Sequence, residues 1–292
     1  EIMLAGNECW VNDGWSPWPL KGYSVVRHWV KCTAMSSLLN DRPGSSVRTR
    51  LNQWLSDYPG LSLVEGESQQ VSEVLPDLFG YHIIQIGWLG TVDLLASSRV
   101  SHRTVINTHP GEATRDCSGP ICLSGALPLV SESVDVVVLP HLLEFEPDPH
   151  QVLRETERIL IGEGHLVILG FNPWSLWGLW RTVLAWRGEP PWCGRFFGIA
   201  RIKDWLALLG FDIIKARRFY FRPPLPSERV MSKLELLERI GRTCWPYLGG
   251  AYIVVAKKRV ATVTPVKTSW RAHRQIISSG IAEPSTRGIN NV

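Results

Sequence analysis

Long apolar runs are missing from this sequence. No stretch of about 20 residues is both apolar and uncharged, as a membrane-spanning helix requires. The first residues, Glu1 to Leu4, also lack the basic segment followed by an apolar one that marks a secretory leader. Both absences predict a cytoplasmic protein. The chain of 292 residues, 45% of them apolar, is long enough to bury a full hydrophobic core.

Paired cysteines are missing as well. The sequence has no C-x-x-C motif and no paired histidine spacing, so neither a zinc site nor a disulfide framework is expected. Scattered thiols of this kind are typical of reduced proteins. We therefore predict no bound metal and free cysteines at all six positions: Cys9, Cys32, Cys117, Cys122, Cys193 and Cys244.

Acidic residues are nearly absent from the end of the chain. Between Lys257 and Val292, seven lysines and arginines accompany one acid, Glu283, while the whole chain has a net charge of only +4. Such a tail is either solvated and disordered or contacts nucleic acid or acidic lipid. We predict three parts: an irregular tryptophan-rich segment at 1–42, an α/β domain at 43–259 with a tryptophan-rich helical insertion at 171–198, and a basic, disordered tail at 260–292.

The domain shows strand and helix patterns in alternation. Val134 to Leu139 is a continuous β-branched run, and Asp148 and Pro149 then begin a helix as its N-cap and first residue. We expect Gly162 to Gly164 to end that helix before the next strand. Strand, helix and strand in this order form a parallel βαβ unit with a right-handed crossover. The other expected strands are 81–87, 102–107, 165–169, 211–221 and 251–256, and the other expected helices are 47–55, 67–74, 174–186 and 202–209.

A family resemblance rests on the residues around this unit. Leu127 to Val137 (LPLVSESVDVV) resembles the "LPF-x-x-x-S-h-D-h-h" segment of class I S-adenosylmethionine (SAM) methyltransferases of the type 11 kind, where h is apolar. His141 to Phe145 and Arg154 to Leu166 resemble the segments that follow it in that family. Gly170 to Ser175 (GFNPWS) is similar to a group of bacterial methyltransferase-like proteins. The resemblance implies a doubly wound, mostly parallel, Rossmann-like α/β fold.

The resemblance also implies a cofactor, SAM, and a site. Ligands of open parallel sheets bind beyond the carboxyl ends of the strands. Glycine in the turn after the first strand lets the backbone approach a ligand, although a tight turn alone would use it equally well. The residues expected to line the cofactor site are Gln85, Gly87, Trp88, Gly90, Asn107, Leu123, Ser124 and His141.

Three carboxylates that the family uses are missing here. Gln85 occupies the acid position of the first motif, Asn107 the position facing the ribose hydroxyls, and Leu123 the position near the adenine. Leu89 also replaces the central glycine of "D/E-x-G-x-G-x-G". Gln85 and Asn107 offer neutral hydrogen bonds in place of charged ones. The alternative is a catalytically degenerate methyltransferase fold that has lost SAM binding and serves as a binding or scaffold protein.

Further side chains have two interpretations each. His141 and Glu144 either form an acid–base pair or close the crevice and pack the neighbouring helix. Asn172 and Trp174 follow a strand end, where they either contact the acceptor substrate or form a turn. A nicotinamide-dependent dehydrogenase is excluded, because the G-x-G-x-x-G motif and its downstream acid are missing.

The tryptophan-rich stretch from Trp174 to Trp192 has three interpretations. Its spacing predicts a helix that packs on the sheet, covers an apolar substrate as a lid, or lies on a membrane surface. The stretch is too short to span a bilayer. Apart from the basic tail, the sequence has no strong nucleic-acid signal.

Overall fold

The computed structural model describes residues 45–89, 92–109, 120–224, 241 and 245–260. The chain divides into two compact units, residues 1–260 and 261–292. Every described residue belongs to the first unit. The predicted segment 1–42 and residues 261–292 of the predicted tail lie outside the described residues. In these ranges, no helix has the length and apolar character to cross a membrane.

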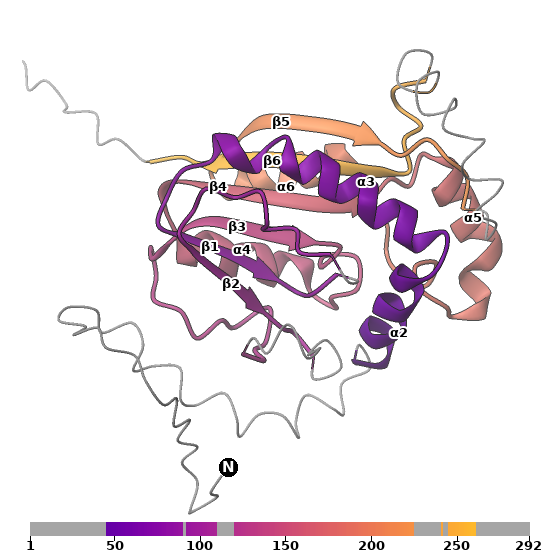
Figure 1. Ribbon diagram of the computed structural model, residues 1–292, viewed down its shortest axis with the longest axis horizontal. Helices are drawn as coiled ribbons and strands as arrows, with labels where there is room; N and C mark the ends of the chain where they lie inside the picture. The colour runs from indigo at the N-terminus through magenta and orange to yellow at the C-terminus, as the bar shows by residue number, and fades with distance from the viewer. Residues whose placement is uncertain (1–44, 90–91, 110–119, 225–240, 242–244, 261–292) are drawn as a thin grey trace, which may run out of the picture. The chain divides into compact units, whose positions relative to one another are not determined.

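The first unit is built on one six-stranded sheet in the order β2-β1-β3-β4-β6-β5 (Figure 1). The first four strands of this order run parallel, and β6 pairs antiparallel with both β4 and β5. The predicted mostly parallel α/β fold is therefore confirmed. The strands are β1 His82–Ile86, β2 His102–Ile106, β3 Val134–Pro140, β4 Leu160–Phe171, β5 Phe211–Phe219 and β6 Ala251–Lys258.

Two apolar cores lie on the two faces of the sheet. Successive side chains of a strand point to opposite faces, and in β3 Val136 and Val138 belong to one core while Val137 and Leu139 belong to the other. The first core includes residues of α2 and α3, and the second includes residues of α4 and α6 (Figure 1). The helices are α2 Ser45–Ser56, α3 Gly60–Ser72, α4 Pro149–Ile159, α5 Leu176–Leu184 and α6 Ile199–Leu208, with short 3-10 turns η3 Leu75–Asp77 and η5 Ala185–Arg187.

Two predicted helix boundaries are wrong. The helix expected from residue 67 begins at Gly60, directly after the turn that ends α2, because this glycine lets α3 cross close to the backbone of Trp54 and Leu55. The helix expected to continue to Gly162 ends at Ile159, and β4 begins at once with Leu160. The start of α4 is confirmed, since the Asp148 carboxylate accepts a hydrogen bond from the Gln151 amide at 3.1 Å.

Candidate functional site

The carboxyl ends of β1, β2 and β3 meet at one edge of the sheet, on the side where α2 lies (Figure 1). The backbone turns that follow these strands begin with Gly87, Asn107 and His141, three of the residues predicted from the sequence. The amide of Gly87 donates to the carbonyl of Ile106 at 2.8 Å, which ties the first two turns together. Gly90 lies outside the described residues. The structure thus assembles most of the predicted cofactor-site residues at this edge.

The turn after β1 has the shape of a ligand cradle. Gly87 has φ +87°, a conformation that residues with a Cβ rarely adopt. The buried side chain of Gln85 stabilises the turn by donating from Nε2 to the Gly87 carbonyl at 2.9 Å. Its Oε1 atom is also buried, and it has no hydrogen-bond partner among the described residues. A buried acceptor of this kind is costly to leave without a partner, so the turn has an unsatisfied polar atom at the end of β1.

Arg48 of α2 reaches into the same turn. Its side chain is buried, its Nη1 donates to the His141 carbonyl at 3.0 Å, and its Nη2 occupies the space that a Cβ on Gly87 would need. A guanidinium therefore lies between the ends of β1 and β3. No motif in the sequence pointed to Arg48. The available signal was its spacing, because Arg48 stands three and seven residues before Leu51 and Leu55 on the core-facing side of the helix.

A buried ionic cluster lies beside the Arg48 contact. His141 Nε2 is 2.5 Å from Oε1 of Glu67 in α3, and His141 Nδ1 is 3.5 Å from Oε1 of Glu144. All three side chains are inaccessible to solvent. The same Glu144 oxygen accepts from the amide of Phe171 at 2.8 Å, and the Phe171 ring stacks on His141 at 4.0 Å. The cluster therefore joins α3, the β3 end and the β4 end.

His141 is a cation at neutral pH. Burial alone lowers its pKa, but the charge of Glu67 and the contacts with Glu144 outweigh burial and raise the pKa to about 10. A protonated imidazole cannot accept a proton. In this structure His141 and Glu144 therefore connect the elements at the ends of β3 and β4. His141 does not have the protonation state that a general base requires.

The predicted residues on the β2 side also come together. The Asn107 amide donates to the Pro120 carbonyl at 2.9 Å, and the Cys122 amide donates to the Asn107 carbonyl at 2.9 Å. Asn107 and Ser124 are buried, and Leu123 is partly buried. The segment that begins at residue 120 therefore extends alongside the end of β2.

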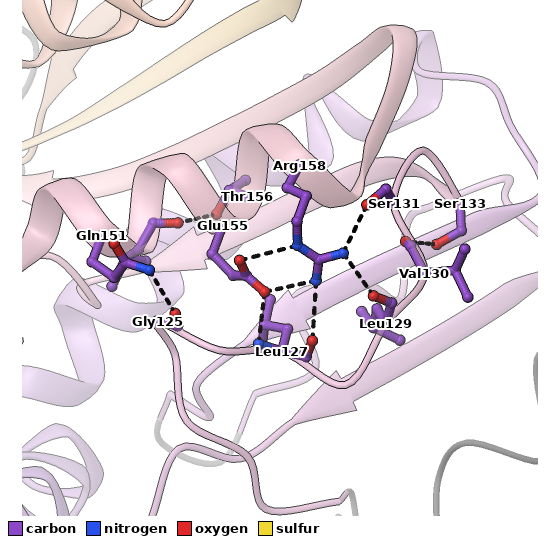
Figure 2. A network of polar contacts seen from close by, with 11 residues as sticks. Gly125, Leu127, Leu129, Val130, Ser131, Ser133, Gln151, Glu155, Thr156 and Arg158 are labelled. Atoms are coloured by element: carbon purple, nitrogen blue, oxygen red, sulfur yellow. Dashed lines mark hydrogen bonds and ion pairs between the residues drawn. The ribbon is translucent and has the colours of Figure 1, made fainter.

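Arg158 and Glu155 of α4 fix the segment that follows (Figure 2). Arg158 donates to the carbonyls of Leu127 and Leu129 at 3.1 and 2.9 Å and to the Ser131 hydroxyl at 3.0 Å. Glu155 accepts from the Leu127 amide at 2.9 Å and pairs with Arg158 at 2.7 Å. The two charged residues of the family-like segment thus hold the chain that leads away from Leu123 and Ser124.

Replacing Arg158 by alanine is expected to lower the free energy of unfolding by about 2 kcal/mol, because its five hydrogen bonds, to four residues, are lost together. Urea unfolding measures the effect. Arg154→Ala on the same helix is the matched control: this more exposed side chain hydrogen-bonds only Gln151 in the described residues and lies 3.9 Å from Asp148, so a change under about 0.5 kcal/mol is expected. Equal losses in both variants would contradict this role of Arg158.

The two residues expected to contact the acceptor differ in environment. Asn172 is buried, and its Nδ2 donates to the carbonyls of Tyr247 and Gly249 at 2.9 Å each, while its Oδ1 accepts from the Trp174 amide at 3.1 Å. The turn interpretation thus describes what Asn172 does in this structure. Trp174 is exposed. In the described ranges, no group of three or more histidine, cysteine or acidic side chains is placed to hold a metal ion.

Comparison with known proteins gives the family. Residues 93–168 match the model of a methyltransferase domain. The uncharacterised protein YafS of Escherichia coli K12 is 36% identical over 203 residues, which are 69% of this chain and 79% of YafS. The chain belongs to the methyltransferase-domain family.

Solved structures agree with this assignment at the level of the fold. A SAM-dependent methyltransferase from Thermotoga maritima has a TM-score of 0.54 at 20% identity, covering 72% of this chain and 99% of the other. A chain from the complex of the Haloferax volcanii Trm112 methyltransferase activator with a methyltransferase has a TM-score of 0.52 at 13% identity, covering 74% and 99%. The methyltransferase domain therefore has the class I fold expected from its sequence.

Proposed function

We propose that the protein is a SAM-dependent methyltransferase that holds its cofactor where β1, β2 and β3 end. The observation that carries the proposal is the turn at Gly87, with its positive φ and the buried, unpartnered Oε1 of Gln85. A cradle and an acceptor without a partner fit a ligand that brings its own hydrogen-bond donors. The ammonium group of SAM is such a donor.

The other groups of the site fit the remaining parts of the cofactor. By the family resemblance, Asn107 faces the ribose hydroxyls, and Leu123 and Ser124 face the adenine. The amino-acid part then faces Gly87, where the Arg48 guanidinium is the partner for its carboxylate. Neutral amides in the place of the family's acids predict weaker binding than a charged set would give.

When bound, SAM supplies an electrophilic methyl group on its sulfonium. The chain's own contribution is then to orient the acceptor and exclude water. Because His141 is already protonated at neutral pH, it does not remove a proton from the acceptor. We therefore propose an acceptor that reaches the site as a nucleophile, without a base from this cluster.

A second candidate function rests on Leu89. This residue is fully buried in the same core as Leu51 and Leu55 of α2, at the position where the resembling family has a glycine. A packed side chain there favours a methyltransferase fold that binds a partner without SAM.

Calorimetric titration with SAM and with S-adenosylhomocysteine separates the two functions. The enzymatic proposal expects saturable binding of both ligands. The absence of heat at millimolar ligand, with a cooperative unfolding transition that proves the protein folded, would reject it in favour of the second candidate. Gln85→Leu keeps the volume of the side chain and removes both polar atoms, so it is expected to weaken SAM binding.

A further inference from the structure

The helix α5 is apolar on both sides. On its inner side, Trp177 is buried against Phe171 and Leu184 packs on the core. The other side has four exposed apolar residues. Three of them lie three, four and seven residues after the first, which places all four on one face of the helix: Leu176, Leu179, Trp180 and Val183. A surface helix of a globular protein ordinarily directs polar residues, not apolar ones, toward solvent. One side of α5 is not covered by the described part of the chain.

Tryptophans extend this exposed side beyond both ends of the helix. Trp174, before α5, is 78% exposed, and Trp186, in η5, is 79% exposed. We call Trp174, Trp186 and the four exposed helix residues the α5 outer face. The Asn172 side chain, just before Trp174, also hydrogen-bonds the carbonyls of Tyr247 and Gly249. The loop that contains these two residues has three exposed apolar side chains: Trp245, Tyr247 and Leu248. Contiguous exposed apolar side chains on this scale mark an interaction surface.

The charges beside the α5 outer face have one sign. From Trp174 to Arg187 the only charged residues are Arg181 and Arg187, and the first acid that follows is Glu189. The Arg187 guanidinium lies over the Trp186 ring at 5.5 Å. Arg181 points to the inner side, where its guanidinium donates to the Gly194 carbonyl at 2.6 Å and lies over the Phe196 ring. Arg187 is exposed and is therefore the cation that lies beside the exposed rings.

We propose that the α5 outer face docks the protein onto an anionic lipid bilayer. The helix has nine residues, too few to cross a membrane, so it lies in the plane of the interface. Tryptophan prefers this depth, because its ring is apolar and its N–H is polar, while arginine pairs with lipid phosphate. Lipid headgroups of negative charge complement the exposed Arg187 beside the Trp186 ring.

A second copy of the chain fits the same surface less well. In contact of two identical faces across a two-fold axis, residue i of one copy meets residue j of the other, and j meets i. Both copies of Arg187 would then lie at the interface, and residues 174–187 contain no acid to neutralise them. The bilayer is the occupant that both the apolar and the charged residues favour. The docking does not depend on methyl transfer.

Flotation of the full chain with vesicles tests the proposal. The vesicles contain phosphatidylcholine alone or phosphatidylcholine with phosphatidylglycerol. The protein is expected to float with the anionic vesicles, and the double variant Leu179→Gln/Val183→Gln is expected to bind them about tenfold more weakly, because two aliphatic side chains leave the apolar phase. Both positions are exposed, at 59% and 62%, so the fold is retained.

The control is Leu208→Gln on α6, a leucine that is 81% exposed on another helix. It is expected to float as the unchanged protein does. Failure of the unchanged protein to float with anionic vesicles would overturn the proposal. Flotation of the double variant at full strength would also overturn it and assign the lipid contact elsewhere, as in the basic tail. If the unchanged protein is a dimer, the double variant is a monomer, and neither protein floats, then the α5 outer face binds a second copy of the chain instead of a bilayer.

Discussion

Replacing Glu67 by glutamine is expected to lower the free energy of unfolding by about 3 kcal/mol, one of the largest effects in this protein. With His141 protonated, Glu67 and Glu144 balance the positive charges of Arg48 and His141. Glutamine has the same shape but no charge, so an uncompensated positive charge remains in a site without solvent. Part of the cost is avoided because His141 then loses its proton more easily.

Urea unfolding measures this loss, and Glu73→Gln is the matched control. Glu73 follows the same helix and pairs with Arg217 at 3.2 Å, but both side chains are about half exposed. Its replacement is expected to cost less than about 1 kcal/mol. Similar losses of unfolding free energy in the two variants would show that the buried pair of Glu67 and His141 contributes no more to stability than an exposed ion pair.

The same cluster predicts a pH dependence of stability. The unfolded chain loses the His141 proton near the ordinary pKa of 6.5, whereas the folded protein keeps it up to about 10. The contribution of this proton is therefore complete below pH 6.5 and is lost as the pH rises to about 10. The stability difference between the unchanged protein and Glu67→Gln is expected to shrink over this range. A difference that grows with pH would contradict the cluster's charge state.

Replacing Arg48 by methionine is expected to weaken SAM binding roughly 10- to 100-fold, as the loss of a charge-assisted contact to a carboxylate predicts. Methionine fills much of the arginine volume, so α2 keeps its packing. Arg48 itself contacts the turn at Gly87 and the carbonyl of His141. Its guanidinium is thus placed where the amino-acid part of the cofactor is proposed to lie.

Calorimetry with SAM measures this change, with Arg50→Met as the control on the same helix. The Arg50 side chain is exposed, and its replacement is expected to leave the dissociation constant unchanged. Unchanged affinity in a folded Arg48→Met variant would remove Arg48 from the cofactor site. Tighter binding would show that Arg48 occupies the crevice, which supports the second candidate function.

The strands and the strand-end residues could be predicted because their signals are local. Val134 to Leu139 is a continuous β-branched run, and a parallel sheet brings the residues after its strands to one edge without further information. Gly87, Asn107 and His141 directly follow β1, β2 and β3, as the strand patterns and the family resemblance together predicted. The prediction that Gly162 to Gly164 end a helix was wrong. These glycines belong to β4, in a part where its pairing with β3 is irregular.

Arg48 and Glu67 could not be predicted in the same way. A charged residue on a helix is ordinarily exposed, and what buries these two is a partner far along the chain. Glu67 and His141 are 74 positions apart, and Arg48 and His141 are 93 positions apart. Helical spacing could place Arg48 on the core-facing side of α2, but only the fold brings these pairs together, so the partners of Arg48 and Glu67 were not visible in local patterns.

The position of β6 has a consequence for the protein during its synthesis. This strand is made last, yet it lies inside the sheet, between β4 and β5. From the completion of β4 at Phe171 until Ala251 has emerged, the growing chain carries an open strand edge rich in valine, isoleucine and leucine. At about 5 to 20 residues per second, this interval lasts roughly 4 to 16 seconds. Open edges of this kind recruit other strands, so the β4 edge of the nascent chain is exposed to pairing with other chains during that interval.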